Sequence, residues 1–152
     1  MDEKSWSPPK WMYRNRQPSD DDAYFENMTR VIFQAGLSWK MIDEKWPNFK
    51  EAFKNFSIDQ VAKFTENDVK RLMSNAGIVR NQAKIVAAIK NAQHFQDIKK
   101  EYGSFRLFLS GLDKSNNYAS FVKELGKRFQ RLGPSSAGIF LYVVGEDFKH
   151  VE

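Results

Sequence analysis

The sequence predicts an all-α fold for this 152-residue chain. Apolar residues recur at intervals of three and four, and no segment alternates with period two for long enough to form a strand. Hydrophobic residues make up 41% of the chain and aromatic residues 14%, which argues against intrinsic disorder and is enough for a buried core. We expect one domain over residues 1–152.

The first predicted helix begins after Ser19, where Asp20, Asp21 and Asp22 form an acidic cap. The apolar residues that follow at helical spacing are Tyr24, Phe25, Met28, Val31, Ile32 and Ala35. This helix delivers the chain to Gly36.

Three more helices are predicted before residue 100. Ser57 precedes a short one with Ile58, Val61 and Phe64. Thr65 caps another, which bears Val69, Leu72 and Met73 and ends at Gly77. Asn81 begins a long helix with Ile85, Val86, Ile89, Ala92, Phe95 and Ile98.

A pair of helices joined by a short glycine-containing hairpin is predicted between residues 118 and 144. Tyr118, Phe121, Val122, Leu125 and Phe129 form the apolar face of the first, and Lys123, Lys127 and Arg131 recur every four residues beside it. The second follows Gly133-Pro134, begins with Ser135 and Ser136, and is apolar from Ile139 to Val144. Free backbone N–H groups at its start, with Gly133, Ser135, Ser136, Lys127 and Arg131, would suit one DNA phosphate, although an ordinary helical hairpin has the same pattern.

The turn Gln34-Ala35-Gly36-Leu37-Ser38-Trp39 is the most informative segment. A protein that extrudes a base from duplex DNA needs an apolar wedge to fill the gap and an aromatic face for the base. Gln34, Gly36 and Leu37 are the candidate wedge, and Trp39 is the candidate face. In the alternative interpretation Gly36 only ends the helix, and Leu37 and Trp39 return to the core.

The net charge of +5 lies in the second half of the chain. Residues 1–76 carry 12 basic and 12 acidic side chains, whereas residues 77–152 carry 12 basic and 7 acidic ones. Basic surface gathered in one half is typical of proteins that bind phosphates, and a solvated basic face without a partner is the alternative.

The sequence has no cysteine, which excludes disulfides and thiolate metal sites and favours an intracellular, cytoplasmic protein. No signal peptide is evident. The longest apolar run, residues 137–144, is too short to span a bilayer, so we expect a soluble chain without membrane contact.

Residues 25–95 resemble the DNA-3-methyladenine glycosylase I family of the helix-hairpin-helix superfamily. The matching residues are Phe25-Glu26, Gln34 to Trp39, Ala52, Phe53, Phe56, Val61-Ala62, Ala76 to Ile78, Arg80, Lys84-Ile85 and Asn91-Ala92. A weaker match runs through residues 102–105, 125–128 and 133–134 to His150, so the resemblance covers about residues 24–150 and leaves 1–23 poorly aligned. It implies a compact helical fold with a helix-hairpin-helix.

Zinc is implied by the resemblance but not by the residues. Family members hold zinc through Cys and His near the N-terminus and a His and Cys near the C-terminus. Here Lys4 and Ser5 stand near the first position, only His150 matches, and the place of the last ligand falls after Glu152. Because structural zinc needs four ligands, we expect no metal and no cofactor, and we expect Trp6, Trp11 and Tyr13 to pin the N-terminal segment by packing.

Val31 occupies the position at which the family places a glutamate that accepts hydrogen bonds from the methylated adenine. The resemblance therefore implies a base pocket formed by Trp39, Trp6, Trp11, Tyr13 and Val31, which would hold a base by stacking. Such a pocket discriminates less between bases, and Val31 as an ordinary core residue is the alternative.

Catalytic residues are not identified by the sequence. Many related glycosylases use an aspartate just after the hairpin, where this chain has Glu146 and Asp147, but two solvated loop carboxylates would look the same. A cationic methylated base leaves easily, so positioning alone could suffice.

Three functions are consistent with these observations. The first is a monofunctional hydrolytic glycosylase that acts as a monomer on double-stranded DNA containing a damaged base. The second is a DNA-binding module that recognises damaged or distorted DNA without this chemistry. The third is a protein-binding helical domain, favoured only if Leu37 and the hairpin are buried.

Overall fold

The computed structural model describes residues 7–14 and 16–149. Within these residues all regular structure is helical, and no strand is present. In chain order the elements are α1 (Asp21–Gln34), α2 (Trp39–Ala52), the short 3-10 helix η2 (Lys54–Phe56), α3 (Ile58–Val61), α4 (Glu66–Met73), α5 (Gln82–Tyr102), α6 (Phe105–Ser110), α7 (Ser115–Arg128) and α8 (Pro134–Val143). The predicted all-α fold is therefore confirmed.

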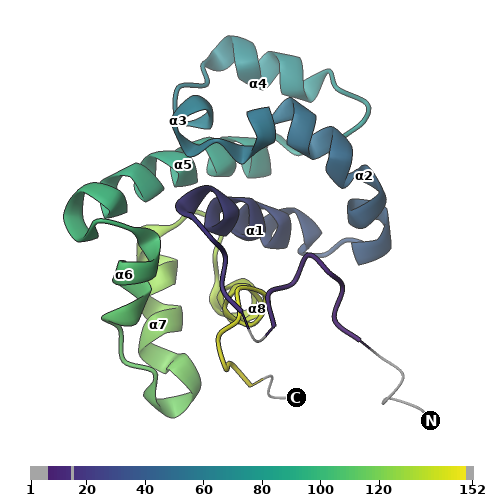
Figure 1. Ribbon diagram of the computed structural model, residues 1–152. Coiled ribbons are helices and arrows are strands. Elements are labelled where there is room, and N and C mark those ends of the chain that lie inside the picture. Colours follow the sequence, from purple (N-terminus) through teal and green to yellow (C-terminus); the bar gives the residue numbers. More distant parts are fainter. Residues whose placement is uncertain (1–6, 15, 150–152) are drawn as a thin grey trace.

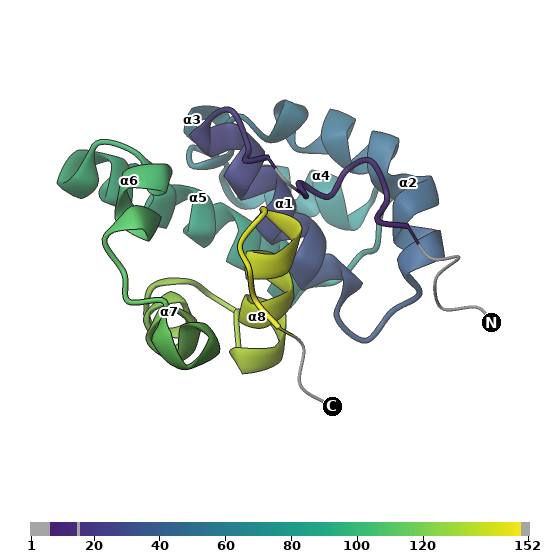
Figure 2. The ribbon, with the colours of Figure 1, turned by 60° about the horizontal axis from the view of Figure 1, so that its bottom comes forward.

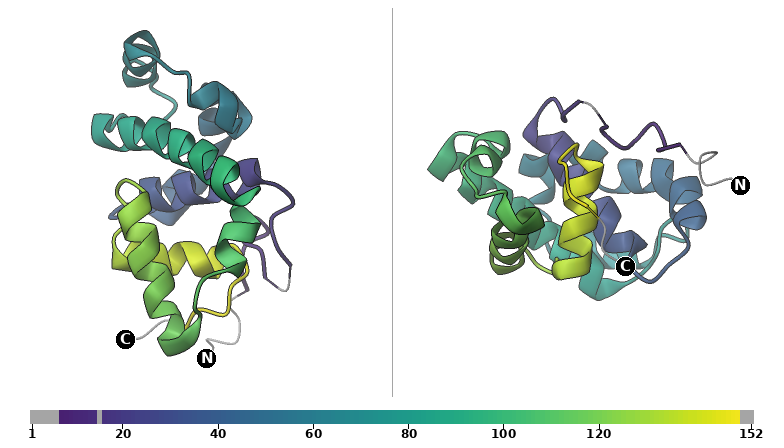
Figure 3. Two further views of the ribbon diagram at one scale, coloured as in Figure 1. Left: turned by 90° about the vertical axis from the view of Figure 1, so that its left-hand side faces the viewer. Right: turned by 90° about the horizontal axis from the view of Figure 1, so that it is seen from below.

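Helix α1 lies in the middle of the molecule and packs against both α5 and α8 (Figure 1). Helices α2 to α4 lie on one side of it and α6 to α8 on the other. The long helix α5 runs between these two groups (Figure 3). Phe95 of α5 lies 4.6 Å from Phe105 of α6 and 5.6 Å from Phe25 of α1, measured between ring centres. Phe25 in turn lies 6.0 Å from Phe56 of η2, so both groups share one core.

Side-chain caps define the start of the helices that form the site. Asp20 accepts a hydrogen bond from the backbone N–H of Ala23 at 2.9 Å, and Asn81 accepts one from that of Lys84 at 3.1 Å. The predicted starts of α1 and α5 are confirmed. Each cap satisfies a backbone donor that the helix itself leaves unpaired.

Some predicted boundaries were wrong. Helix α3 is a single turn that ends before Phe64, and α4 ends at Met73 rather than Gly77. Gly77 belongs to a separate turn, in which its N–H donates to Asn75 Oδ1. At the start of α7 the backbone of residues 116–118 has positive φ angles, so the regular helix begins only after Tyr118.

None of the helices in the described part of the chain is both long and apolar enough to cross a membrane.

Candidate nucleic-acid interface

A cavity of about 290 Å³ joins the turn after α1 to the start of α8. In Figure 2, where α8 crosses α1, both segments lie along the lower edge of the molecule. The cavity is lined by Val31, Gln34, Ala35, Gly36, Leu37, Trp39, Ser135, Ser136 and Ile139. It thus brings together the predicted wedge, two predicted pocket residues and two predicted phosphate ligands. Its volume is near the lower limit for small-molecule sites, as a single planar base requires.

The turn after α1 points Leu37 away from the core. Gly36 has a φ of +77°, which L side chains rarely adopt, and the N–H of Leu37 donates to the Gln34 carbonyl at 2.9 Å. As a result Leu37 is 37% exposed and Trp39 is 42% exposed. This exposure contradicts the alternative in which both side chains return to the core.

Gln34 lies behind the tip of the turn. It is only 2% exposed, so it does not project beside Leu37 as a second wedge residue. Gln34 is one of the residues that line the cavity, and its amide is buried, with no hydrogen-bond partner for Oε1 or Nε2.

The aromatic residues of the N-terminal segment do not all reach the cavity. The ring of Trp11 lies 6.3 Å from that of Trp39, tilted by 52°, and extends the aromatic surface beside the cavity. Tyr13 packs elsewhere: its N–H donates to the carbonyl of Val143 near the far end of α8, and its ring contacts Arg16. Trp6 lies outside the described residues.

Arg30 holds Trp11 in this position. Its guanidinium lies 4.0 Å from the centre of the Trp11 ring and 5.1 Å from that of Trp46, and it pairs with Asp43 at 2.6 Å. Burial lowers the pKa of Arg30, and the contact with Asp43 opposes that change. A buried guanidinium stacked on indole faces is a rigid support, because both its charge and its plane are used.

The start of α8 presents backbone donors beside the cavity. Gly133 is the N-cap residue and supplies no side-chain cap, and Pro134 fills the first helical position. The N–H groups of Ser135 and Ser136 have no partner inside the helix and lie at its positive end, an arrangement that suits an anion. Gly133, Ser135, Lys127 and Arg131 are exposed, and Ser136 is partly exposed.

Helix α5 holds both the end of α1 and the hairpin that precedes α8. Lys84 Nζ donates to the carbonyls of Phe33 and Ala35 at 3.2 and 3.0 Å, and therefore holds the end of α1. Seven residues further on, the Asn91 amide accepts from the N–H of Gln130 at 2.7 Å and donates to its carbonyl at 3.2 Å, which holds the hairpin. In the sequence, Lys84 and Asn91 stand out only as residues that match the family. Their separation of seven, which places them on one helix face, was the available signal.

The carboxylates considered for catalysis are remote from the cavity. Glu146 follows the far end of α8, ten residues after Ser136, and a helix of that length spans roughly 15 Å. Glu146 is buried and interacts with the Tyr118 hydroxyl at 3.2 Å and with Lys114 at 3.3 Å. Asp147 is exposed and has an ion-pair contact with Lys149. The alternative of two solvated loop carboxylates is therefore wrong for Glu146 and holds for Asp147, and neither residue lines the cavity.

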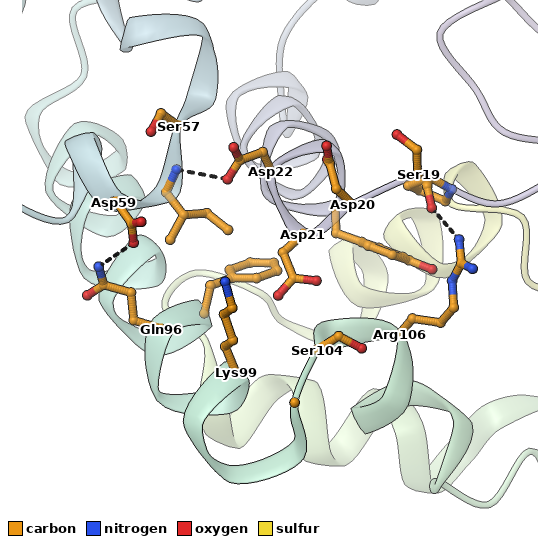
Figure 4. A pocket seen from close by; sticks show the side chains of 15 residues that line it. Ser19, Asp20, Asp21, Asp22, Ser57, Asp59, Gln96, Lys99, Ser104 and Arg106 are labelled. Atoms are coloured by element: carbon orange, nitrogen blue, oxygen red, sulfur yellow. Dashed lines mark hydrogen bonds between the residues drawn. The ribbon is translucent and has the colours of Figure 1, made fainter.

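A second cavity, of about 450 Å³, lies at the opposite end of α1 (Figure 4). Its carboxylates are used by the fold: Asp22 accepts from the N–H of Ile58, and Asp59 accepts from Gln96. Because Asp20, Asp21 and Asp22 would repel phosphates, this cavity is not suited to DNA.

The residues present do not fit the zinc site of the family. The sequence has no cysteine and two histidines, of which His150 lies outside the described residues. The ring of the other, His94, packs against Phe129. Over residues 7–14 and 16–149, no three potential ligand side chains come together.

Comparisons with known proteins find the same family by sequence and by structure. The methyladenine glycosylase family matches residues 9–138. The DNA-3-methyladenine glycosylase of Haemophilus influenzae is 32% identical over 107 residues, which cover 70% of this chain and 54% of that protein. The chain therefore spans about half the length of the curated relatives it matches.

Solved structures share the fold over most of the chain. A glutamate-to-glutamine mutant of 3-methyladenine DNA glycosylase I from Staphylococcus aureus has a TM-score of 0.78 and 30% identity, covering 91% of this chain and 86% of that one. A tyrosine-to-phenylalanine variant of 3-methyladenine DNA glycosylase I, solved in complex with 3-methyladenine, has a TM-score of 0.76 and 30% identity with the same coverage. The chain belongs to the methyladenine glycosylase family.

Proposed function

We propose that this protein is a monofunctional DNA glycosylase of base-excision repair, which hydrolyses the N-glycosidic bond of an alkylated base such as 3-methyladenine. The observation that carries the proposal is the cavity in which the exposed turn, Trp39 and the start of α8 meet. The relatives of this chain are named as 3-methyladenine DNA glycosylases.

Each part of the interface has a role in this reaction. Leu37 enters the double helix where the nucleotide leaves, and the extruded base stacks on Trp39 in the cavity. The N–H groups of Ser135 and Ser136 bind a neighbouring phosphate, and the exposed side chains of Lys127 and Arg131 add attraction for the backbone. The protein acts as a monomer on double-stranded DNA.

The chemistry depends on the leaving group more than on a protein acid. None of the nine residues that line the cavity is an aspartate or glutamate. An alkylated cationic base departs readily, so fixing its sugar and base in place supplies the main catalytic contribution. This accounts for the position of Glu146 and Asp147 away from the cavity.

The absence of a cavity carboxylate also favours a second candidate, a module that binds damaged DNA without cleaving it. A protein-binding domain is disfavoured, because Leu37 and Gly133 are exposed.

Release of free bases from methylated duplex DNA, measured by mass spectrometry, separates the two candidates. The wild type is expected to release methylated adenine, and Trp39→Ala is expected to release much less. Leu107→Ala is the matched control, because Leu107 is an exposed apolar residue on α6, away from the interface. Binding to abasic-analogue DNA without any base release would establish the second candidate.

A further inference from the structure

We propose that the side-chain amide of Gln34 recognises the edge of the base in the cavity and selects an adenine whose N6 amino group and N7 are both free. This inference rests on the proposed function, because it requires an extruded base beside Trp39.

The first observation is that the Gln34 amide is buried without partners. Gln34 is 2% exposed, and both Oε1 and Nε2 lack a hydrogen bond. Among the described residues, the other buried unpaired side-chain atoms are single atoms of Asp21 and Arg30, each of which has another polar atom in a hydrogen bond. Burial of a whole amide without partners is unfavourable, and a bound base that pairs with it would remove that penalty.

The second observation is the position of Gln34 relative to the cavity. Gln34 follows Val31 by three residues on α1, so both lie on one helix face, and both line the cavity with Trp39. If the plane of the base stacks on Trp39, its edge is directed to other cavity walls. Val31 is apolar, which leaves Gln34 as the polar group that α1 provides there.

The chemistry of the amide then limits the base. A glutamine pairs with adenine through two hydrogen bonds, because Oε1 accepts from the N6 amino group and Nε2 donates to N7. A methyl group at N3 leaves this edge intact, whereas a methyl group at N7 blocks it. Guanine has an acceptor, O6, where adenine has the N6 donor, so it loses one of the two bonds.

Binding of free bases tests the inference separately from catalysis. The probes are 3-methyladenine and 7-methyladenine, titrated into the wild type, Gln34→Met and Gln60→Met by calorimetry. Gln34→Met keeps the size of the side chain and removes its amide. Gln60→Met is the control, because Gln60 is an exposed glutamine on α3 that lines none of the cavities described above.

The wild type and Gln60→Met are expected to bind 3-methyladenine about tenfold more tightly than 7-methyladenine, and Gln34→Met is expected to bind both equally. The preference of the wild type is decisive even if Gln34→Met does not fold. Equal or absent binding of the two bases by the wild type, or a preference that persists in Gln34→Met, would overturn the inference.

A parallel assay of base release distinguishes this result from the proposed function. Base binding that depends on Gln34, without release from DNA, would leave this inference standing and refute hydrolysis. Release of bases with a preference unaffected by Gln34→Met would refute this inference and leave hydrolysis standing.

Discussion

Leu37 is the residue on which the wedge model can be tested most directly. It is 37% exposed at the tip of a turn, so truncation costs less than in the core, where Leu→Ala lowers the free energy of unfolding by about 2–5 kcal/mol. Leu37→Ala is expected to lower it by less than about 1.5 kcal/mol. Loss of apolar contact inside the DNA should weaken binding to an abasic-analogue duplex by about tenfold, while binding to undamaged DNA changes little.

Leu107→Ala is the control, because Leu107 is 57% exposed and lies on α6. This substitution is expected to leave the affinities for the abasic-analogue duplex and for undamaged DNA unchanged. Denaturant unfolding and fluorescence anisotropy on the two duplexes measure these quantities. A loss of several kcal/mol in stability for Leu37→Ala would contradict the wedge model, because it would identify a core residue.

Lys84 predicts a pH dependence of stability. Burial is the main cause that lowers its pKa in the folded protein, and repulsion from Arg131 adds to it. Between that lowered pKa and the ordinary value of about 10.4, the unfolded chain binds more protons than the folded one, so stability rises with pH. The melting temperature of the wild type, relative to that of Lys84→Met, should therefore increase as the pH approaches 10.

This comparison cancels the titration of the other lysines and tyrosines, which both proteins share. A temperature difference that is constant or falls over the same range would show that Lys84 has no lowered pKa.

At the scale of elements, Asn91 of α5 holds the hairpin between α7 and α8. Asn91→Leu leaves the N–H and carbonyl of Gln130 without their partner, and should lower the free energy of unfolding by about 1–3 kcal/mol. Because the hairpin also presents the donors of α8, DNA affinity should fall as well. Asn67→Leu, an exposed position on α4, serves as the control. Equal stability of the two variants would mean that Asn91 does not support the hairpin.

Helix starts could be predicted from the sequence more reliably than helix ends. Asp20 and Asn81 cap α1 and α5 as expected, because these caps use local hydrogen bonds that residue types reveal. The patterns considered did not identify α2 or α6. Helix α2 contains Pro47, which normally argues against a helix interior, and tertiary packing of Ile42, Trp46 and Phe49 outweighs that tendency.

The candidate site was predicted only in its local parts. The turn and the start of α8 have recognisable residues, and the structure brings them together at one cavity. Gln34 is not the predicted wedge residue because its side chain turns inward, and Tyr13 is not in the predicted pocket because the N-terminal segment follows another path. Side-chain direction and chain path are set by contacts between distant residues, such as that of Tyr13 with Val143, and spacing along the chain does not show them.

For the whole molecule, the excess of basic residues in the second half predicts a salt-dependent affinity for DNA. Each phosphate contact contributes about 0.9 to the slope of log affinity against log salt concentration. Arg131→Gln should reduce that slope by about this amount, whereas Lys63→Gln, which changes an exposed lysine between α3 and α4, should not. Anisotropy titrations across a salt series measure the slopes. Equal slopes for the two variants would place Arg131 outside the DNA interface.

The whole fold is also expected to be independent of metal. The sequence lacks the cysteines of the family's zinc site and has two histidines, so a chelator should leave the melting temperature of the purified protein unchanged. Stoichiometric zinc in that protein, or a lower melting temperature with chelator, would contradict this expectation.

Lys84 and Asn91 of α5 hold the end of α1 and the hairpin before α8, so the number of residues between them sets the distance between the two parts of the interface. Seven residues correspond to nearly two full turns, so Lys84 and Asn91 emerge on the same side about 10 Å apart along the axis. One inserted residue would rotate one anchor by about 100° relative to the other. The wedge and the phosphate-binding helix could then not both meet the same duplex, even with every contacting residue unchanged. A substitution at the exposed Lys90 of this stretch is therefore tolerable where an insertion or deletion is not.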